Sequence, residues 1–129
     1  MTPFSPGPDT APWWQRLRDG ALTVQVCIEC GAVQGYPRSA CAACTSARVE
    51  LRAASGRATL YSFTVVWRAP EPAMAVPYVL ALVDLEEGPR LMTRLVDIAP
   101  ADVRIGMAVR LARCEPLSDA VALPLFAAV

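Results

Sequence analysis

The sequence predicts a mainly β chain in which a short N-terminal helix and a cysteine-rich module precede a barrel of five strands. Three observations carry this prediction. A proline and a glycine bracket a short amphipathic segment, two Cys-x-x-Cys pairs follow it, and from Gly56 onward strand-like runs alternate with turns. With 54% hydrophobic and 19% charged residues the chain can bury an ordinary core, which excludes global disorder.

The first residues, 1–11, are predicted to form a disordered lead. Met1 to Pro12 holds four prolines and no basic residue, a composition that neither a signal peptide nor a transit peptide has. No apolar run approaches the roughly 20 residues needed to cross a bilayer. Because cysteines in a chain without an export signal favour reduced thiols, we expect a cytoplasmic protein that contacts no membrane.

Residues 12–22 are predicted to contain the helix. Pro12 suits the first helical position and Gly20 suits the residue just past the end. Trp13, Trp14 and Leu17 would share one side of this helix. Two interpretations are equally open: the side chains cap the core of their own domain, or they dock a partner protein, since so small a helix can hardly bury two adjacent tryptophans.

Residues 23–54 are predicted to form a metal-binding ribbon. Strand-like runs at Leu22–Val26 and Arg48–Arg52 flank two Cys-x-x-Cys pairs, and the four thiols belong to Cys27, Cys30, Cys41 and Cys44. Two residues between thiols let a tight turn aim both sulfurs at one ion, and Gly31 tolerates the left-handed backbone that such a turn requires. Four thiolates suit a tetrahedral zinc ion, as in a zinc ribbon.

The predicted ion is structural, because four protein ligands leave no position for water or substrate. Two alternatives are weaker. Disulfides conflict with a reducing compartment, and a redox Cys-x-x-Cys pair needs a thioredoxin-like context that is absent from the sequence.

Other reactive side chains do not form a catalytic constellation. The chain has no histidine, which removes the commonest general base. Cys114 is interpreted as a small strand residue on the face opposite Met107, Val109 and Leu111, beside Glu115. The carboxylates of Asp84, Glu86, Glu87 and Asp97 lie at turns and strand ends, where they are normally solvated or cap turns. We therefore expect no enzyme activity from this chain.

Residues 55–129 are predicted to form the barrel. Its expected strands are Thr59–Trp67, Tyr78–Leu85, Arg90–Val96, Met107–Glu115 and Ala120–Phe126, with one helical turn at Ala99–Val103. The first strand places Tyr61, Phe63, Val65 and Trp67 on one face, expected to fill the barrel, and the second is apolar enough to be buried on both sides. Five strands with a break after the third fit an OB-fold, although the strand count also permits a small sandwich.

The charge distribution argues against nucleic acid. Residues 13–57 carry six arginines against three acidic residues, an excess that a four-thiolate zinc site reduces from +3 to +1. Polynucleotide binding usually needs a basic surface, which this chain does not show.

The order of these elements resembles the DUF35 family of zinc-ribbon OB-fold proteins from about residue 12 to the end. The matching stretches are Trp14–Gly20, the cysteine quartet, Tyr36–Arg38, Gly56–Val66, Pro77–Leu85, Glu87–Leu91, Asp102–Met107 and Leu123–Phe126. The resemblance implies a non-catalytic accessory subunit of a thiolase-superfamily acyl-CoA enzyme, either a thiolase, a lipid-transfer-protein-like aldolase or an acyltransferase. It also implies a hetero-oligomer, and some members of the family take part in steroid degradation.

Further expectations follow from this resemblance. The module would stabilise the partner and help to bind or channel acyl-CoA, with Arg16, Arg18 or Arg38 meeting the CoA phosphates. Solvated surface arginines are the simpler interpretation of those three. The competing functions are a single-stranded nucleic-acid-binding OB-fold protein, which needs aromatic side chains on a basic groove, and a stand-alone acyl-CoA carrier.

Overall fold

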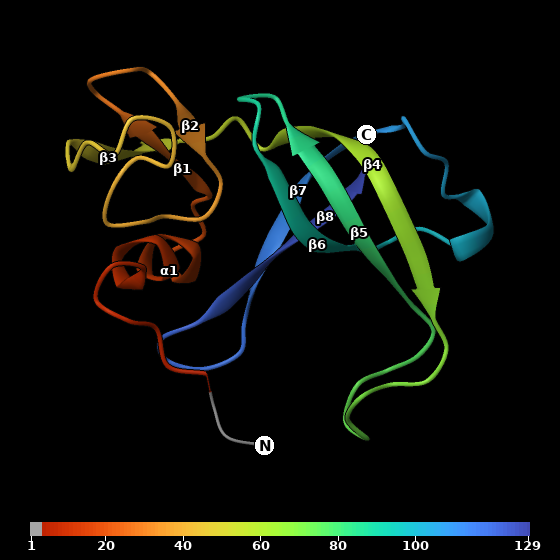
Figure 1. The fold of residues 1–129 in the computed structure, drawn as a ribbon. Coiled ribbons are helices and arrows are strands. Elements are labelled where there is room, and N and C mark those ends of the chain that lie inside the picture. Colours follow the sequence, from red (N-terminus) through yellow and green to blue (C-terminus); the bar gives the residue numbers. More distant parts are fainter. Residues whose placement is uncertain (1–3) are drawn as a thin grey trace.

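The computed structural model describes residues 4–129 and confirms the predicted fold class, with a helix and a ribbon beside a closed barrel (Figure 1). The helix α1 spans Ala11–Arg18, with Pro12 in its first turn. Three antiparallel strands form the ribbon sheet in the order β2-β1-β3. Their bounds are Thr23–Cys27 for β1, Val33–Gln34 for β2 and Val49–Ala53 for β3.

The barrel has the strand order β4-β5-β6-β8-β7, and β7 pairs back onto β4. Its strands are β4 (Arg57–Val66), β5 (Tyr78–Leu85), β6 (Arg90–Leu95), β7 (Ala108–Pro116) and β8 (Ala122–Ala128). The short helix η1 (Pro100–Asp102) lies between β6 and β7, at the predicted break. A five-stranded barrel closed in this order is the OB-fold rather than a sandwich.

The helix α1 contributes its apolar side to the core of the chain itself. Trp13 is 2% exposed and Leu17 is fully buried, and the indole Nε1 of Trp13 donates to the backbone carbonyl of Thr23 at 2.9 Å. Trp14 is only half-buried. Trp13 and Leu17 therefore cap the core of their own domain. Of the three side chains, only Trp14 has exposed surface that a partner could contact.

A β-bulge at Tyr61 corrects the prediction that an aromatic stripe fills the barrel. In the pairing of β4 with β5, Leu60 faces Val83 and Ser62 faces Leu82, so Tyr61 is the extra residue. Such an insertion reverses which side chains point inward. Leu60 lies in the core before the bulge, Phe63 packs against the core after it, and Tyr61 at the bulge is 48% exposed. Trp67 is 70% exposed because it lies beyond the end of β4.

A second bulge corrects the predicted orientation of Cys114. In the pairing of β7 with β8, Leu111 faces Phe126 and Arg113 faces Leu125, which leaves Ala112 as the extra residue. Cys114 therefore packs against the core on the same side as Leu111 instead of on the opposite face.

The strand β5 also differs from its prediction. Its side chains alternate between buried and half-buried, so only one face lies in the core. Val79, Ala81, Val83 and Leu85 point inward, whereas Leu80 and Leu82 lie on the outer face of the barrel. The continuous apolar run thus marks a strand with an apolar outer surface, not a strand covered on both sides.

The predicted lead of residues 1–11 is described only from Phe4 onward, and residues 1–3 lie outside the described part of the chain. The ring of Phe4 lies 5.4 Å from that of Trp14, and the backbone N–H groups of Thr10 and Ala11 donate to the carbonyl of Gly7. The disorder of this lead stays a prediction. Across residues 4–129, no helix has both the length and the apolar character to span a membrane.

Candidate metal centre and ribbon–barrel groove

The four predicted ligands come together at the end of the ribbon sheet. Cys27 ends β1, and Cys30, Cys41 and Cys44 lie in the two loops that follow. All four Sγ atoms lie within 4.8 Å of one another. The pairs Cys27/Cys44 and Cys30/Cys41 each have an Sγ–Sγ distance of 3.6 Å, and no cysteine among the described residues forms a disulfide.

This geometry fits a zinc ion. Four sulfurs held tetrahedrally at about 2.3 Å from one ion lie about 3.8 Å from each other, close to the observed separations. The backbone N–H groups of Cys44 and Ala43 lower the pKa of the Cys41 thiol to about 6, which favours the thiolate that binds metal. The backbone N–H of Ser46 lowers the pKa of the Cys44 thiol, but the neighbouring thiols of Cys27 and Cys30 outweigh this effect and raise that pKa to about 12. The Cys44 proton is therefore released when a metal cation binds.

The two Cys-x-x-Cys loops share one backbone design. The N–H of Gly31 donates to the carbonyl of Cys27 and the N–H of Thr45 to that of Cys41, each at 2.9 Å. Both Gly31 and Thr45 have a positive φ, +78° and +65° respectively. Glycine adopts this conformation freely, whereas a β-branched residue is strained in it.

A buried glutamine network ties the second loop to the sheet. The side-chain amide of Gln25 donates to the carbonyl of Arg38 at 2.8 Å, and its oxygen accepts from the N–H of Arg38 at 3.0 Å. Gln34 bonds the oxygen of Gln25 and accepts from the N–H of Ala42 at 2.9 Å. These contacts place the loop that carries Cys41, and nothing in the spacing of the sequence indicated them.

A groove lies where the barrel is least tightly closed, between β6 and β8. These strands are parallel and pair only through Arg94/Leu125 and Leu95/Phe126, so the start of β6 diverges from the start of β8. Tyr36 of the ribbon reaches across, and its hydroxyl oxygen accepts the backbone N–H of Met92 at 3.1 Å. On the opposite side of the gap the hydroxyl of Thr93 donates to the carbonyl of Pro124.

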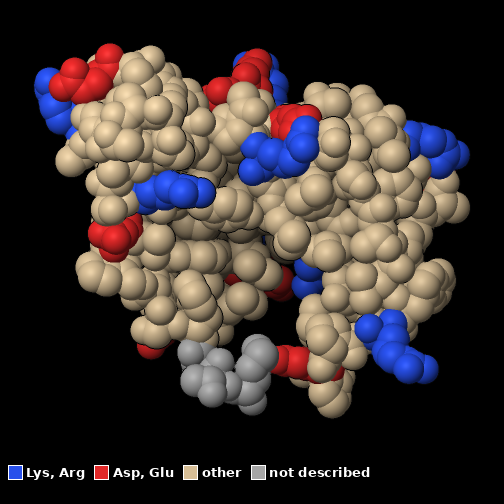
Figure 2. Space-filling model, viewed as in Figure 1, with Lys and Arg blue, Asp and Glu red and all other residues tan. Residues whose placement is uncertain are grey.

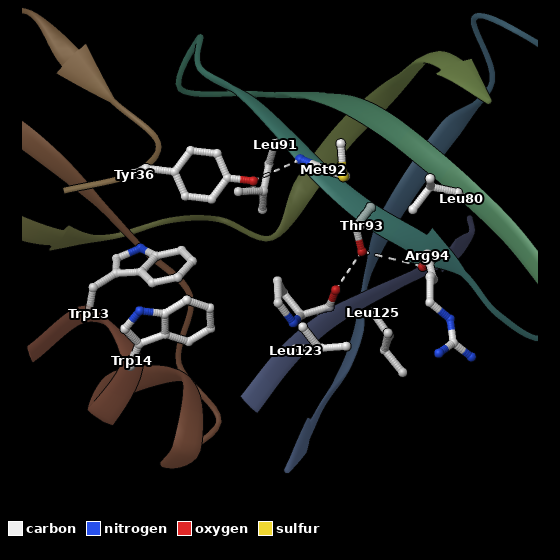
Figure 3. A pocket seen from close by; sticks show the side chains of 11 residues that line it. Trp13, Trp14, Tyr36, Leu80, Leu91, Met92, Thr93, Arg94, Leu123 and Leu125 are labelled. Carbon is white, nitrogen blue, oxygen red and sulfur yellow. Dashed lines mark hydrogen bonds between the residues drawn. The ribbon is translucent and has the colours of Figure 1, made fainter. Parts of the chain in front are cut away.

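We call this gap the ribbon–barrel groove. Its volume is about 260 Å³. One wall consists of the rings of Trp13, Trp14 and Tyr36, and the facing wall consists of barrel side chains, as Figure 3 shows. The barrel residues that line it are Leu80, Leu91, Met92, Thr93, Arg94, Leu123, Pro124 and Leu125. In the space-filling view this side of the molecule is mostly uncharged and is hollowed between the ribbon and the barrel (Figure 2).

Arg94 is the charged residue of the groove, and the sequence analysis did not select it. Its guanidinium carbon lies 5.0 Å from the centre of the Tyr78 ring. Its Nε is buried and has no hydrogen-bond partner among the described residues. Its position in the strand was the only indication in the sequence. Arg90, Met92 and Arg94 alternate with the buried residues of β6 and therefore share its outer face.

The arginines predicted to meet CoA phosphates lie elsewhere. Arg16 and Arg18 occupy the last turn of α1, where a basic side chain interacts favourably with the helix dipole. Arg38 lies in the ribbon and is held through its backbone by Gln25. None of the three lines the groove, and their phosphate contacts stay a prediction.

The carboxylates and the fifth cysteine considered in the sequence lie in settings that do not favour catalysis. Asp84 pairs with Arg90 at 2.7 Å, Asp97 with Arg113 at 3.2 Å and Glu86 with Arg57 at 3.5 Å. A hydrogen bond with Ser55 and the charge of Arg57 lower the pKa of Glu86, which keeps that carboxylate ionised. Burial raises the pKa of Cys114, the opposite of what a nucleophilic cysteine needs.

Comparison with known proteins places these observations in a family. Residues 14–50 match the family model described as ChsH2, rubredoxin-like zinc ribbon domain, and residues 51–113 match the one described as ChsH2, C-terminal OB-fold domain. A DUF35 domain-containing scaffold protein of Methanocaldococcus jannaschii is 35% identical over 99 residues, which cover 74% of this chain and 70% of that protein. The chain belongs to the DUF35 family.

Two longer relatives are subunits of hydratases. A probable enoyl-CoA hydratase alpha subunit of Thermomonospora curvata is 38% identical over 92% of this DUF35 chain, and the 3-oxo-4,17-pregnadiene-20-carboxyl-CoA hydratase alpha subunit of Mycobacterium tuberculosis is 40% identical over 79% of it. The matches span only 37% and 32% of the length of those proteins. The activities in their names belong to the longer chains.

A solved structure matches almost the whole of this DUF35 chain. A chain of the Ltp2-ChsH2(DUF35) aldolase superimposes with a TM-score of 0.88 at 35% identity and covers 98% of both chains. Together with the rubredoxin-like zinc ribbon match and the clustered thiols, the DUF35 assignment identifies zinc as the cofactor, and Cys27, Cys30, Cys41 and Cys44 are its candidate ligands.

Proposed function

We propose that this chain is a non-catalytic accessory subunit of a thiolase-superfamily acyl-CoA enzyme. In that role it stabilises a catalytic partner in a hetero-oligomer and helps to hold the acyl-CoA substrate. The partner is a thiolase, a lipid-transfer-protein-like aldolase or a related acyltransferase.

The observation that carries this proposal is the likeness to the Ltp2-ChsH2(DUF35) aldolase chain, which extends over 98% of both chains at 35% identity. A likeness that includes the helix, the ribbon and the barrel together is more specific than a shared OB-fold, which hosts many functions. The word scaffold in the names of the archaeal relatives agrees with a supporting role.

The chemistry of the site supports the same role. Four thiolates fill the zinc shell, so this ion offers no open position for a substrate. The sequence contains no histidine, and Cys114 has a raised pKa. With neither an activated nucleophile nor a perturbed general base beside the groove, catalysis is assigned to the partner.

The proposed substrate class is an acyl-CoA thioester with a bulky acyl group. The names of the hydratase relatives contain enoyl-CoA and a steroid carboxyl-CoA. Transfer of this class to the present chain is part of the proposal, because those relatives are much longer than the matched region.

Single-stranded nucleic acid is the weaker alternative. An OB-fold binds it with aromatic platforms on a basic groove. Here Trp13 is buried, and the groove walls are apolar apart from Thr93 and Arg94. A polynucleotide shift assay at physiological salt tests this alternative directly, and our proposal expects no shift.

Co-purification tests the proposed function. The tagged chain is expressed in its native host, washed at moderate salt, and the retained proteins are identified and quantified. We expect one thiolase-superfamily subunit in stoichiometric amount. Addition of acyl-CoA to the purified complex should give turnover, whereas the isolated chain should give none.

A matched bait strengthens that experiment. A variant with Cys41→Ser has a broken zinc shell, and it should lose the partner together with the ribbon structure. A Cys114→Ser bait keeps the zinc site and should retain the partner. Recovery of the chain alone, or with nucleic acid that resists salt, would contradict the proposal.

A further inference from the structure

The outer face of the barrel beside the groove is unusually apolar for a solvated surface. A second hollow of about 210 Å³ lies over β4, β5 and β6, and Leu80 and Met92 line both hollows. Ser62, Phe63 and Thr64 of β4 and Ala81 and Leu82 of β5 complete its lining. Met92, which lines both hollows, is 55% exposed, and Tyr36 at the edge of the groove is 48% exposed. Contiguous apolar surface of this kind marks an interaction site.

Each hollow has the capacity for one large side chain. A cavity of about 150 Å³ accommodates benzene, so volumes of about 260 Å³ and 210 Å³ suit an aromatic or a branched aliphatic group each. Both hollows are open toward solvent instead of being enclosed. A small-molecule site usually buries most of its ligand within one cavity, whereas two shallow hollows side by side suit two side chains of one protein segment.

The positive charge at the groove lacks a negative partner among residues 4–129. Arg94 is half-buried over Tyr78, and it forms no ion pair with any residue from 4 to 129. By contrast, Arg90 on the same face is neutralised by Asp84 at 2.7 Å. A half-buried guanidinium whose Nε is buried and unpartnered gains from a carboxylate supplied from outside.

We propose that the ribbon–barrel groove and the adjoining hollow dock a segment of the partner subunit that carries two large apolar side chains and one carboxylate. The apolar side chains seat on either side of Met92, and the carboxylate binds Arg94. Trp14, Tyr36 and Arg94 provide the aromatic and arginine anchors that dominate protein interfaces. This inference rests on the proposed function and specifies which surface performs it.

Affinity measurements on the purified partner test the surface. The thiolase-superfamily subunit recovered by co-purification is titrated with the zinc-loaded chain, and the Kd is compared among variants. Arg94→Glu should raise the Kd about 30-fold or more, since it places two carboxylates together at a site that the partner covers. Met92→Ala should raise it about fivefold. Both variants should keep the zinc content and the circular dichroism spectrum of the wild type.

Matched controls lie away from the two hollows. Arg110→Glu reverses an exposed charge on β7, and Ile105→Ala removes a side chain that is 68% exposed. Neither should change the Kd more than about twofold. A partner segment identified by cross-linking should contain an acidic residue whose reversal to arginine restores binding of the Arg94→Glu variant.

The possible outcomes separate the two claims. If the wild-type chain binds the partner and Arg94→Glu binds equally well, the docking surface is wrong and the proposed function stands. If the wild-type chain retains no such subunit, the proposed function fails and the docking surface with it. If Met92→Ala or Arg94→Glu instead converts a dimer of this chain into monomers in light scattering, the surface binds a second copy and the inference is overturned.

Discussion

The hydroxyl oxygen of Tyr36 accepts the backbone N–H of Met92 at 3.1 Å, a contact that joins residues 56 positions apart in the chain. Tyr36 belongs to the ribbon and Met92 to β6, at the edge where β6 has separated from β8. The phenol therefore satisfies a donor that the barrel leaves unpaired. It also links the ribbon to the barrel at the edge of the ribbon–barrel groove.

Tyr36→Phe should destabilise the chain by about 1 kcal/mol, because the hydrogen bond to the N–H of Met92 is lost while the ring is retained. Urea unfolding at saturating zinc measures this change. Tyr78→Phe is the control, since its hydroxyl makes no hydrogen bond within residues 4–129, and it should change stability by less than about 0.5 kcal/mol. A loss no larger than that of Tyr78→Phe would show that the hydroxyl of Tyr36 does not stabilise the chain.

The two adjacent tryptophans should respond differently to the same substitution. Trp13→Phe removes the hydrogen bond to Thr23 and leaves a cavity, at a cost of about 2–3 kcal/mol. Trp14→Phe changes a half-buried ring with no hydrogen bond in the described structure and should cost less than about 1 kcal/mol. The free energy of unfolding in urea distinguishes them, and a larger loss from Trp14→Phe would contradict the placement of these side chains.

The zinc site should depend on all four clustered cysteines and not on the fifth. Purified wild-type chain should contain one zinc per chain by elemental analysis. Cys41→Ser should lose the ion and unfold the ribbon, since structural zinc contributes about 10 kcal/mol or more of binding energy. Cys114→Ser should retain the full zinc content, and a loss of zinc from that variant would refute the ligand set.

Thr45 offers an unusual stabilising substitution. Its φ of +65° strains a β-branched residue, while the equivalent position in the first loop is Gly31. Thr45→Gly should stabilise the ribbon by about 1 kcal/mol, because relief of roughly 1–3 kcal/mol of strain exceeds the entropy that glycine adds to the unfolded chain. Thermal unfolding with zinc present measures the gain. Ala43→Gly, at a residue without a positive φ, should destabilise the same loop.

The raised pKa of Cys114 predicts slow alkylation. Because burial disfavours the thiolate, reaction of the folded, zinc-loaded chain with iodoacetamide should be slower than that of a free thiol at pH 8. The rate should still be rising above pH 9, the ordinary pKa of the thiol. Peptide mass spectrometry follows this residue alone, and a rate plateau below pH 8 would contradict the predicted direction.

The sequence predicted the helix, the clustering of four thiols and all five barrel strands because each depends on local patterns. Hydrophobic alternation identifies a strand, and paired cysteines identify a metal loop. The errors at Tyr61 and Cys114 have one cause. A single inserted residue, Tyr61 in β4 or Ala112 in β7, reverses the facing of every residue after it, and alternation within one strand cannot show such an insertion.

The ribbon–barrel groove could not be predicted from the sequence for a different reason. It requires Tyr36, Met92 and Pro124 to meet, and the contact between the ribbon and the barrel has no periodic signature. The apolar run in β5 did contain information, but it was interpreted as burial on both sides. In the structure Leu80 and Leu82 form the apolar outer surface of the proposed docking site.

The short parallel contact between β6 and β8 also bears on the order in which the chain assembles. The strands β4, β5 and β6 form a meander and β7 and β8 form a hairpin, so each group can form through neighbouring segments. Joining them requires Arg94 to meet Leu125 and Arg57 to meet Arg110, pairings between distant positions whose loop-closure entropy is high. The barrel should therefore close late in folding, and amide protons along β6 beside β8 should exchange with solvent earlier than those between β4 and β5.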